Sequence, residues 1–322
     1  MNSRKLHHVY GPVLSRRLGR SLGIDPVQFK VCTYDCVYCQ LGRTTNKTMD
    51  RQEYVPIEMI LEELREKLAA NNGIDSITLA GSGEPTLNSA IGELIRQVKS
   101  MTDIPVSVLT NGSLLWIMEV RDALMEADIV LPSLDAGDER LFHYVNRPHG
   151  DISFERMVQG LVDFTQSFPG EVWLEVLLLA GVTGVNAEVE KIAKLVERIG
   201  PAKTHLNTVY RPPSEEFAFP LAMEQLVALK EFFPGKVEII MDREDQDAVM
   251  TDYCSIRASD ILTLLSRRPC TASEVAGSLG IHATEVLKYL EKLFEDGSLR
   301  RILTGGRSFY THTRSGNGEG KS

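Results

Sequence analysis

Long apolar runs are missing from this chain of 322 residues. Its longest apolar segments, such as residues 176–182, fall far short of the ~18 consecutive apolar residues that a membrane-spanning helix needs. Residues 1–10 are polar and lack the apolar core of a secretory signal peptide. The sequence therefore predicts a cytoplasmic protein without a membrane partner.

An excess of positive charge is also missing. The chain has 35 Lys and Arg against 44 Asp and Glu, which gives a net charge of −9. This balance disfavours broad electrostatic attraction to nucleic acid or anionic lipid, but it is compatible with a local basic patch. Apolar residues make up 43% and charged residues 25% of the chain, and these globular values exclude wholesale disorder. The length suggests about two domains.

Cysteine is scarce, and its placement argues against a disulfide framework. There are five cysteines, an odd number in a chain predicted to be cytoplasmic. Cys32, Cys36 and Cys39 lie together, whereas Cys254 and Cys270 are isolated and far away. The cluster is therefore the feature to interpret.

Apolar segments of strand length alternate with amphipathic segments between about residues 20 and 240. The expected strands are 76–80, 106–110, 129–131, 172–179, 205–209 and 237–240, and the expected helices are 57–70, 91–99, 114–125, 154–168, 187–199 and 221–233. This order predicts a parallel sheet with right-handed crossovers.

Polar residues follow four of the expected strands. They are Ser82, Gly83 and Glu84, then Asn111 with Gly112, Ser133 with Asp135, and Asn207 with Arg211. Because functional groups gather at the C-terminal ends of parallel strands, we expect these sets to face one mouth. The alternative is that they are turn residues selected only for backbone geometry.

A different pattern follows residue 241. Residues 242–254 are acidic and lack periodicity, as in a linker. Three expected helices follow at 258–266, 271–279 and 284–294, with Thr271 as an N-cap and Val286, Leu287, Leu290 and Leu293 facing inward. Segments 299–303 and 308–313 then flank a hairpin signal at 304–307. These elements predict a small winged-helix-like domain over 255–314, followed by a disordered Gly-rich tail over 315–322.

The cysteine spacing predicts a metal centre. Thiolates select zinc, copper(I) or iron–sulfur clusters. A structural zinc site needs four protein ligands, and the sequence has no second Cys-x-x-Cys pair. A cubane cluster held by three thiolates keeps one iron open, as a catalytic site requires. Two alternatives stay open, namely three buried thiols without metal, and zinc with His7, His8 or Cys254 as the fourth ligand.

The motif Cys32-x3-Cys36-x2-Cys39, with Tyr38 before its last cysteine, resembles the signature of the radical S-adenosylmethionine (radical SAM) superfamily. The resemblance implies a (β/α)6 partial barrel of the TIM type over residues 1–241. It also implies that the three cysteines hold a 4Fe–4S cluster and that the open iron binds SAM. Reductive cleavage of SAM would then give methionine and a 5′-deoxyadenosyl radical, which abstracts hydrogen from the substrate. An electron donor such as a flavodoxin or ferredoxin is implied as a partner.

Further residues resemble the SAM contacts of that superfamily. Gly83 and Glu84, with Ser82 in place of a first glycine, resemble its glycine–glycine–glutamate motif, which holds the SAM amino group. The remaining positions that are similar to SAM contacts are Asn111, Ser133 and Asp135 for the ribose or carboxylate, and Tyr38 for the adenine.

The flanking segments 11–19, 39–43 and 207–213 are similar to the branch that contains the wyosine-type tRNA synthases. That resemblance implies a modified tRNA base as a substrate. Those enzymes also carry a second cluster on cysteines that precede the SAM motif, and this chain has none before Cys32. A protein or small-molecule substrate is therefore the alternative, and a redox-sensing winged-helix regulator is a third hypothesis.

Three arginines are candidate contacts for an anion or for the substrate. Arg16 and Arg17 belong to a short basic group before the cysteine loop, and Arg211 is followed by two prolines after an expected strand. Guanidinium groups suit carboxylates and phosphates, whereas the competing interpretation is an ordinary solvated surface.

Overall fold

The computed structural model describes residues 7–70, 73–240, 258–281 and 283–313. A mostly parallel sheet of eight strands lies within the first two of these ranges. The strand order is β1-β2-β5-β6-β7-β8-β9-β10, with β1 antiparallel to β2 and the other pairs parallel. The strands are β1 (Val9–Ser15), β2 (Gly19–Ile24), β5 (Ser76–Leu79), β6 (Val106–Thr110), β7 (Ile129–Pro132), β8 (Glu171–Leu178), β9 (Lys203–Thr208) and β10 (Val237–Ile239). The predicted α/β class is confirmed, and this sheet is consistent with a partial barrel.

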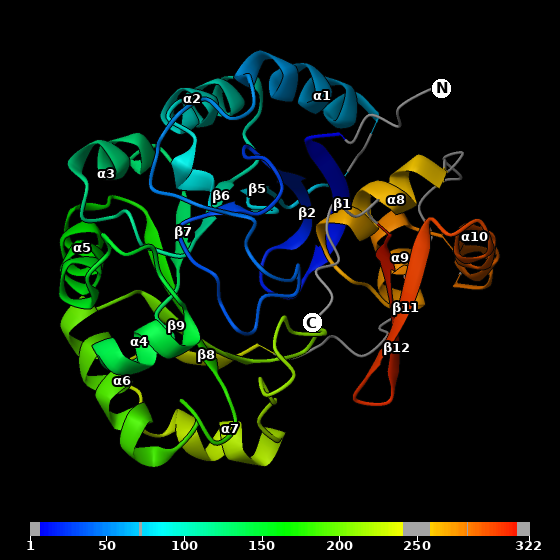
Figure 1. The fold of residues 1–322 in the computed structure, drawn as a ribbon. Helices are drawn as coiled ribbons and strands as arrows, with labels where there is room; N and C mark the ends of the chain where they lie inside the picture. The colour runs from blue at the N-terminus through cyan, green and yellow to red at the C-terminus, as the bar shows by residue number, and fades with distance from the viewer. Residues whose placement is uncertain (1–6, 71–72, 241–257, 282, 314–322) are drawn as a thin grey trace.

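Helices line the outside of the curved sheet (Figure 1). They are α1 (Ile57–Ala70), α2 (Ile91–Met101), α3 (Met118–Leu124), α4 (Glu139–Val145), α5 (Phe154–Ser167), α6 (Asn186–Ile199) and α7 (Met223–Lys230). Each of the longer helices buries one apolar stripe, such as Leu94, Ile95 and Val98 of α2. These stripes and the apolar residues of the strands form one hydrophobic core. Burial of this apolar surface is the dominant favourable term in folding. No described helix is long and apolar enough to cross a bilayer.

The structure differs from the sequence-based prediction mainly at the first two strands. Both were missed because glycine interrupts their apolar pattern, at Gly11 in β1 and at Gly19 and Gly23 in β2. Helix α3 begins at Met118, since turns occupy the residues before it, and the short helix α4 was not predicted. The remaining predicted strands and helices are present with shifts of a few residues at their ends.

A C-terminal module, residues 258–313, consists of α8 (Ala258–Arg267), α9 (Ala272–Leu279), α10 (Ala283–Glu295) and the hairpin β11 (Leu299–Thr304) with β12 (Arg307–His312). As predicted, Thr271 caps α9 and Gly280 ends it in the left-handed conformation. The prediction for Leu287 was wrong, because that side chain is 39% exposed on the outer face of α10. The winged-helix class stays a prediction. The predicted linker 242–254 with Cys254 and the predicted tail 315–322 lie outside the described residues.

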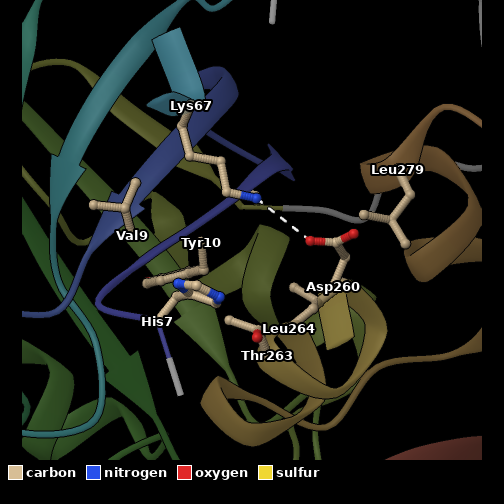
Figure 2. A pocket seen from close by; sticks show the side chains of 9 residues that line it. His7, Val9, Tyr10, Lys67, Asp260, Thr263, Leu264 and Leu279 are labelled. Atoms are coloured by element: carbon tan, nitrogen blue, oxygen red, sulfur yellow. Dashed lines mark hydrogen bonds and ion pairs between the residues drawn. The ribbon is translucent and has the colours of Figure 1, made fainter. Parts of the chain in front are cut away.

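The C-terminal module packs against the edge strand β1 (Figure 1). Tyr10 and Val13 of β1 belong to the same hydrophobic core as the buried residues of α8, α9 and α10. Beside this core, Lys67 of α1 reaches Asp260 of α8 at 3.5 Å across a narrow pocket (Figure 2). The module therefore covers apolar side chains of the edge strand β1.

A buried ion pair joins the module to the barrel. Arg267, the last residue of α8, places its Nη1 2.7 Å from Asp25 Oδ2 just after β2. The two side chains are only 6% and 0% exposed. Asp25 Oδ2 also accepts a hydrogen bond from Ser82 Oγ at 2.6 Å, and Arg267 Nη2 donates to the His7 carbonyl at 2.7 Å. These contacts partly compensate for the removal of the two charges from water, whereas Asp25 Oδ1 and Arg267 Nε are buried without a hydrogen-bond partner.

We predict that Arg267→Met lowers the free energy of unfolding by about 3–5 kcal/mol, because it leaves the Asp25 carboxylate buried without its counter-charge. The double variant Arg267→Met/Asp25→Asn, which removes both charges, is expected to recover most of the loss. Urea denaturation followed by circular dichroism measures both. Lys99→Met, which breaks an ion pair that is 37% and 38% exposed, is the control and is expected to cost less than about 1 kcal/mol. Equal losses in Arg267→Met and Lys99→Met would contradict the assignment.

Candidate functional site

The cysteine loop, residues 25–48, lies between β2 and α1 and presents three thiols from one short segment. Cys32 ends the two-residue strand β3 (Val31–Cys32), which pairs in parallel with β4 (Asn46–Lys47). Asp35 Oδ1 accepts the N–H of Thr44 at 2.7 Å and ties the two arms of the loop together. Cys32, Cys36 and Cys39 are half-buried, and none forms a disulfide.

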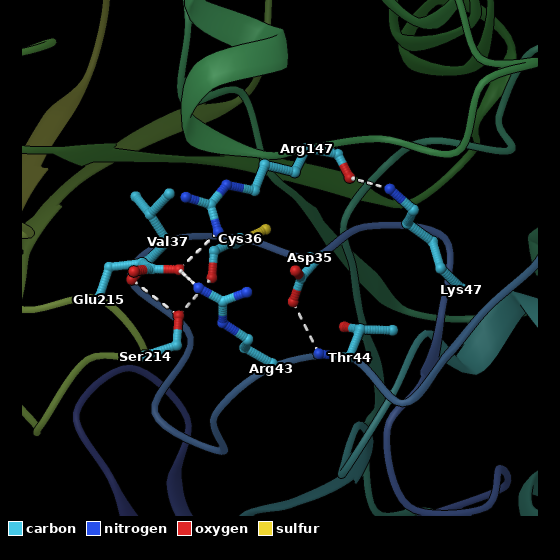
Figure 3. A network of polar contacts seen from close by, with 9 residues as sticks. All are labelled: Asp35, Cys36, Val37, Arg43, Thr44, Lys47, Arg147, Ser214 and Glu215. Atoms are coloured by element: carbon cyan, nitrogen blue, oxygen red, sulfur yellow. Dashed lines mark hydrogen bonds and ion pairs between the residues drawn. The ribbon is translucent and has the colours of Figure 1, made fainter. Parts of the chain in front are cut away.

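The segment after β9 clamps the middle of this loop (Figure 3). Ser214 Oγ lies 2.9 Å from the carbonyl oxygens of both Cys36 and Val37. Glu215 donates its N–H to the Val37 carbonyl at 3.0 Å, and its carboxylate accepts from Arg147 Nη1 at 2.6 Å. The backbone around the second cysteine is therefore held from two sides by residues far away in the sequence.

Burial makes the thiols hard to ionise without a compensating cation. It raises the pKa of Cys32 to about 12, and the nearby Glu84 and Cys39 add to the shift. Burial also raises the pKa of Cys36 well above its usual value, together with Asp135 and the other two cysteines. The three sulfurs thus lie close enough to repel one another as thiolates. A cationic metal centre removes this penalty, because a coordinating thiol is deprotonated outright.

A cluster and a single metal ion require different arrangements of their ligands. The described side chains contain no group of three or more His, Cys, Asp or Glu that could hold one metal ion. Zinc with His7 or His8 as the fourth ligand therefore has no support among them, and Cys254 lies outside them. A 4Fe–4S cluster makes a different demand, because each thiolate binds a different iron and the sulfurs need not converge on one point. Three free, half-buried thiols fit that donor set.

Glu84 connects the end of β5 to the end of β6. Its side chain is buried, and its Oε1 accepts the N–H of Thr86 at 3.1 Å and the hydroxyls of Thr86 and Thr110 at 2.6 Å each. Its Oε2 accepts the N–H of Asn111 at 2.8 Å. Burial raises the pKa of Glu84, and these hydrogen bonds oppose the shift. Oε1 is saturated, whereas Oε2 keeps capacity for one further donor.

Gly83 brings the Ser82–Glu84 motif against the cysteine loop. A Cβ at Gly83 would lie 2.0 Å from the carbonyl oxygen of Val31, so only glycine fits there. Hydrogen bonds on either side join the two segments, from Lys30 N–H to the Ser82 carbonyl at 2.7 Å and from Glu84 N–H to the Val31 carbonyl at 3.0 Å. The sequence analysis gave Gly83 as part of a SAM-binding motif, and the structure shows that its missing Cβ allows a close approach of the cysteine loop.

Asp135 accepts hydrogen bonds from Tyr38 of the cysteine loop and from two other segments. Its Oδ2 accepts from Tyr38 Oη and from Asn146 Nδ2, the latter at 2.8 Å, and its Oδ1 accepts the N–H of Leu177 at 3.1 Å. Burial and this carboxylate raise the pKa of Tyr38 well above its usual value, so its hydroxyl stays protonated as the donor. Ser133 lies just beyond β7, where its backbone bridges to β8.

The three candidate arginines lie near one another. Burial lowers the pKa of Arg17 to about 9, and the positive charges of Arg16 and Arg211 lower it further. Each of the two buried guanidinium groups already has a protein carboxylate, since Arg17 pairs with Glu175 in β8 and Arg211 pairs with Glu274 in α9. Their use as anion contacts stays a prediction.

Three residues of the site were missed by the sequence analysis. Lys30 lies two residues before Cys32 and contacts the sulfur of Cys39, but an isolated lysine carries no pattern. Asn146 follows α4, a helix that was not predicted. Asp25 comes directly after β2, so the rule that selected the other strand-end residues would have found it if that strand had been predicted.

Comparison with known proteins identifies a family. The model of the radical SAM superfamily matches residues 28–196. A UPF0026 protein of Methanocaldococcus jannaschii is 32% identical over 94% of this chain and 94% of its own length. A protein of Brachyspira hyodysenteriae named GTPase Obg is 41% identical over 94% of this chain, which spans only 45% of that relative.

Solved structures support the same fold. A radical SAM methyltransferase from Sphaerobacter thermophilus aligns with a TM-score of 0.52 at 18% identity, covering 68% of this chain and 66% of that one. SuiB of Streptococcus suis aligns with a TM-score of 0.53 at 15% identity, covering 68% and 49%. At these identities the likeness concerns the fold alone. On the family match, the chain belongs to the radical SAM superfamily and is a radical SAM enzyme with a 4Fe–4S cluster and SAM as its cofactors.

Proposed function

We propose that Cys32, Cys36 and Cys39 hold the 4Fe–4S cluster and leave one iron open for the amino and carboxylate groups of SAM. The observation that carries the proposal is a single anchored loop that presents three free, half-buried thiols. Cys270, the one other described cysteine, is buried in the C-terminal module and does not belong to this loop. A three-thiolate cluster with an open iron matches the needs of a ligand-binding cluster.

When bound, the cluster supplies the electron that splits SAM into methionine and a 5′-deoxyadenosyl radical, which takes a hydrogen atom from the substrate to give 5′-deoxyadenosine. The chain itself holds and orients the reactants. Glu84 fixes the backbone at the ends of β5 and β6, and its Oε2 accepts one further N–H, which we assign to the SAM ammonium group. Asp135 orients Tyr38, which we assign to the adenine side of the pocket.

The C-terminal ends of the strands offer SAM its remaining contacts. Asn111 donates its Nδ2 to Thr33 Oγ1 at 2.7 Å and so belongs to the same surface as the cysteine loop. With Ser133 and Asp135 it forms the side that we assign to the SAM ribose and carboxylate. Ser82 points instead toward the buried Asp25, and we assign it a supporting role. The reaction also needs a one-electron donor, for which a small flavodoxin- or ferredoxin-type protein is proposed.

A tRNA base is the substrate class that one specific feature of the structure favours. Arg300, Arg301 and Arg307 are exposed on the β11–β12 hairpin, in a chain whose net charge is negative. Arg307 Nη1 donates to Tyr210 Oη at 2.7 Å, so the hairpin lies against the segment that follows β9. A basic hairpin beside the barrel would contact RNA phosphates while a base enters the barrel. A protein or small molecule is the alternative substrate. The redox-sensing regulator is not proposed, because the chain is an enzyme.

We predict that the triple variant Cys32→Ala/Cys36→Ala/Cys39→Ala binds no iron after anaerobic reconstitution with iron and sulfide. It is also expected to form no 5′-deoxyadenosine from SAM and dithionite. The matched control is Cys270→Ala, which removes a thiol outside the loop and is expected to keep iron content and product formation. Chemical iron analysis and chromatography of the nucleoside measure both. Product formation by the triple variant would refute the cluster assignment.

We predict that Glu84→Gln weakens SAM binding by roughly ten- to a hundredfold while the iron content stays unchanged. The reason is that the amide loses one charge-assisted acceptor, worth about 1.5–3 kcal/mol, and places an N–H₂ group against donors that now face a carboxylate. Anaerobic calorimetry of SAM binding is the measurement. Glu93→Gln on the exposed face of α2 serves as the control. Wild-type affinity in Glu84→Gln would remove this residue from the SAM site.

For the substrate, we predict that bulk tRNA binds the intact chain with an affinity that falls steeply with salt. The double variant Arg300→Ser/Arg301→Ser is expected to bind more weakly and to reduce the salt slope by about one unit per arginine. Filter binding over a range of KCl concentrations gives the slope. Lys230→Ser on α7, which removes one positive charge outside the hairpin, is the control and is expected to keep the wild-type slope to within one unit. If tRNA does not bind, or binds both variants with the wild-type slope, a protein or small-molecule substrate is favoured.

A further inference from the structure

Each of the three cysteine sulfurs faces one side-chain N–H donor. Lys30 Nζ lies 3.1 Å from Cys39 Sγ, Asn111 Nδ2 lies 3.6 Å from Cys32 Sγ, and a second side-chain amide is similarly placed at the remaining sulfur. That amide is Asn146 Nδ2, 3.6 Å from Cys36 Sγ. The two amides come from segments that are distant in sequence, whereas Lys30 belongs to the cysteine loop itself. Lys30 differs from the two amides because it brings a full positive charge.

Lys30 is held in place at a cost to the backbone. It is only 3% exposed, and its φ of +57° lies in the left-handed region that residues other than glycine rarely adopt. Such a conformation is strained and persists only where the surroundings impose it. Here the Lys30 N–H donates to the Ser82 carbonyl at 2.7 Å, and its own carbonyl accepts from Asn46 N–H at 3.1 Å.

The buried ammonium group needs an anion. Among the described residues, its hydrogen bond goes to Cys39 Sγ, and it forms no ion pair with a carboxylate. A neutral thiol is a weak partner for a buried charge. A 4Fe–4S cluster on three thiolates carries a net charge of about −1 when oxidised and about −2 when reduced, by the formal charges of its parts. The cluster would therefore supply the anion that Lys30 otherwise lacks.

We infer that Lys30 is the counter-charge of the cluster and that it raises the cluster's reduction potential. The inference rests on the proposed cluster ligands. A fixed positive charge next to a ligating sulfur stabilises the more negative, reduced state more than the oxidised state, and hydrogen bonds to the sulfurs act in the same direction. Lys30 thereby makes the cluster easier to reduce by the external electron donor before SAM is cleaved.

The test is a redox titration of the reconstituted cluster, followed by electron paramagnetic resonance. Lys30→Met keeps the length of the side chain and the backbone strain but removes the charge. It is expected to bind iron normally and to shift the reduction equilibrium at least tenfold toward the oxidised cluster, which is about 59 mV more negative for one electron. Lys30→Arg is expected to stay near the wild-type potential. Lys47→Met, which removes an exposed lysine of the same loop, is the control.

The outcomes separate this inference from the proposed function. A wild-type potential in Lys30→Met overturns the inference, and so does weaker SAM binding in Lys30→Met at an unchanged potential, since Lys30 would then be a SAM contact. If Lys30→Met holds no cluster, Lys30→Gln, which keeps an N–H donor without the charge, is titrated instead, and a wild-type potential there is equally negative. Absence of a cluster from the wild-type protein would refute the proposed function itself.

Discussion

The site depends on the close contact between the cysteine loop and the Ser82–Glu84 motif. The missing Cβ of Gly83 allows the two backbones to touch at the Val31 carbonyl, and two hydrogen bonds join them there. This contact places the first cysteine next to the residues that follow β5. Any larger residue at position 83 would push the thiols away from the strand ends, because backbone atoms cannot give way as a flexible side chain can.

Residues of the Ser82–Glu84 motif also hydrogen-bond to more distant parts of the fold. Glu84 links the motif to the end of β6 through Thr110, and Asp25 links it to α8 through Arg267. The C-terminal module is therefore connected to the Ser82–Glu84 motif by a buried charge pair, although its hairpin is exposed. Such networks are sensitive to the loss of one partner, since an uncompensated buried charge costs several kcal/mol. The module supports the geometry of the barrel mouth whatever else it binds.

Much of this architecture follows from periodicity and spacing. The run of residues 172–179 was identifiable as a strand, and Thr271 and Gly280 marked the ends of α9 because caps act locally. The first two strands were not identifiable, since glycine breaks their pattern and only pairing within the sheet stabilises them. Asn146 reaches Cys36 only through tertiary placement, and Lys30, although it belongs to the cysteine loop, is an isolated lysine without a recognisable pattern. The spacing of the cysteines was informative because one short loop supplies all three thiols.

The packing of β1 into the core of the C-terminal module has a consequence for the order of events during synthesis. His7 and Arg267, which meet at this interface, are 260 residues apart. The first strand therefore emerges from the ribosome long before the helices that cover it, and until they arrive its apolar side chains Tyr10 and Val13 lack their packing partners. Such a nascent chain is a natural client for chaperones that shield exposed strands, and its final cooperative unit forms only when both ends of the described chain come together.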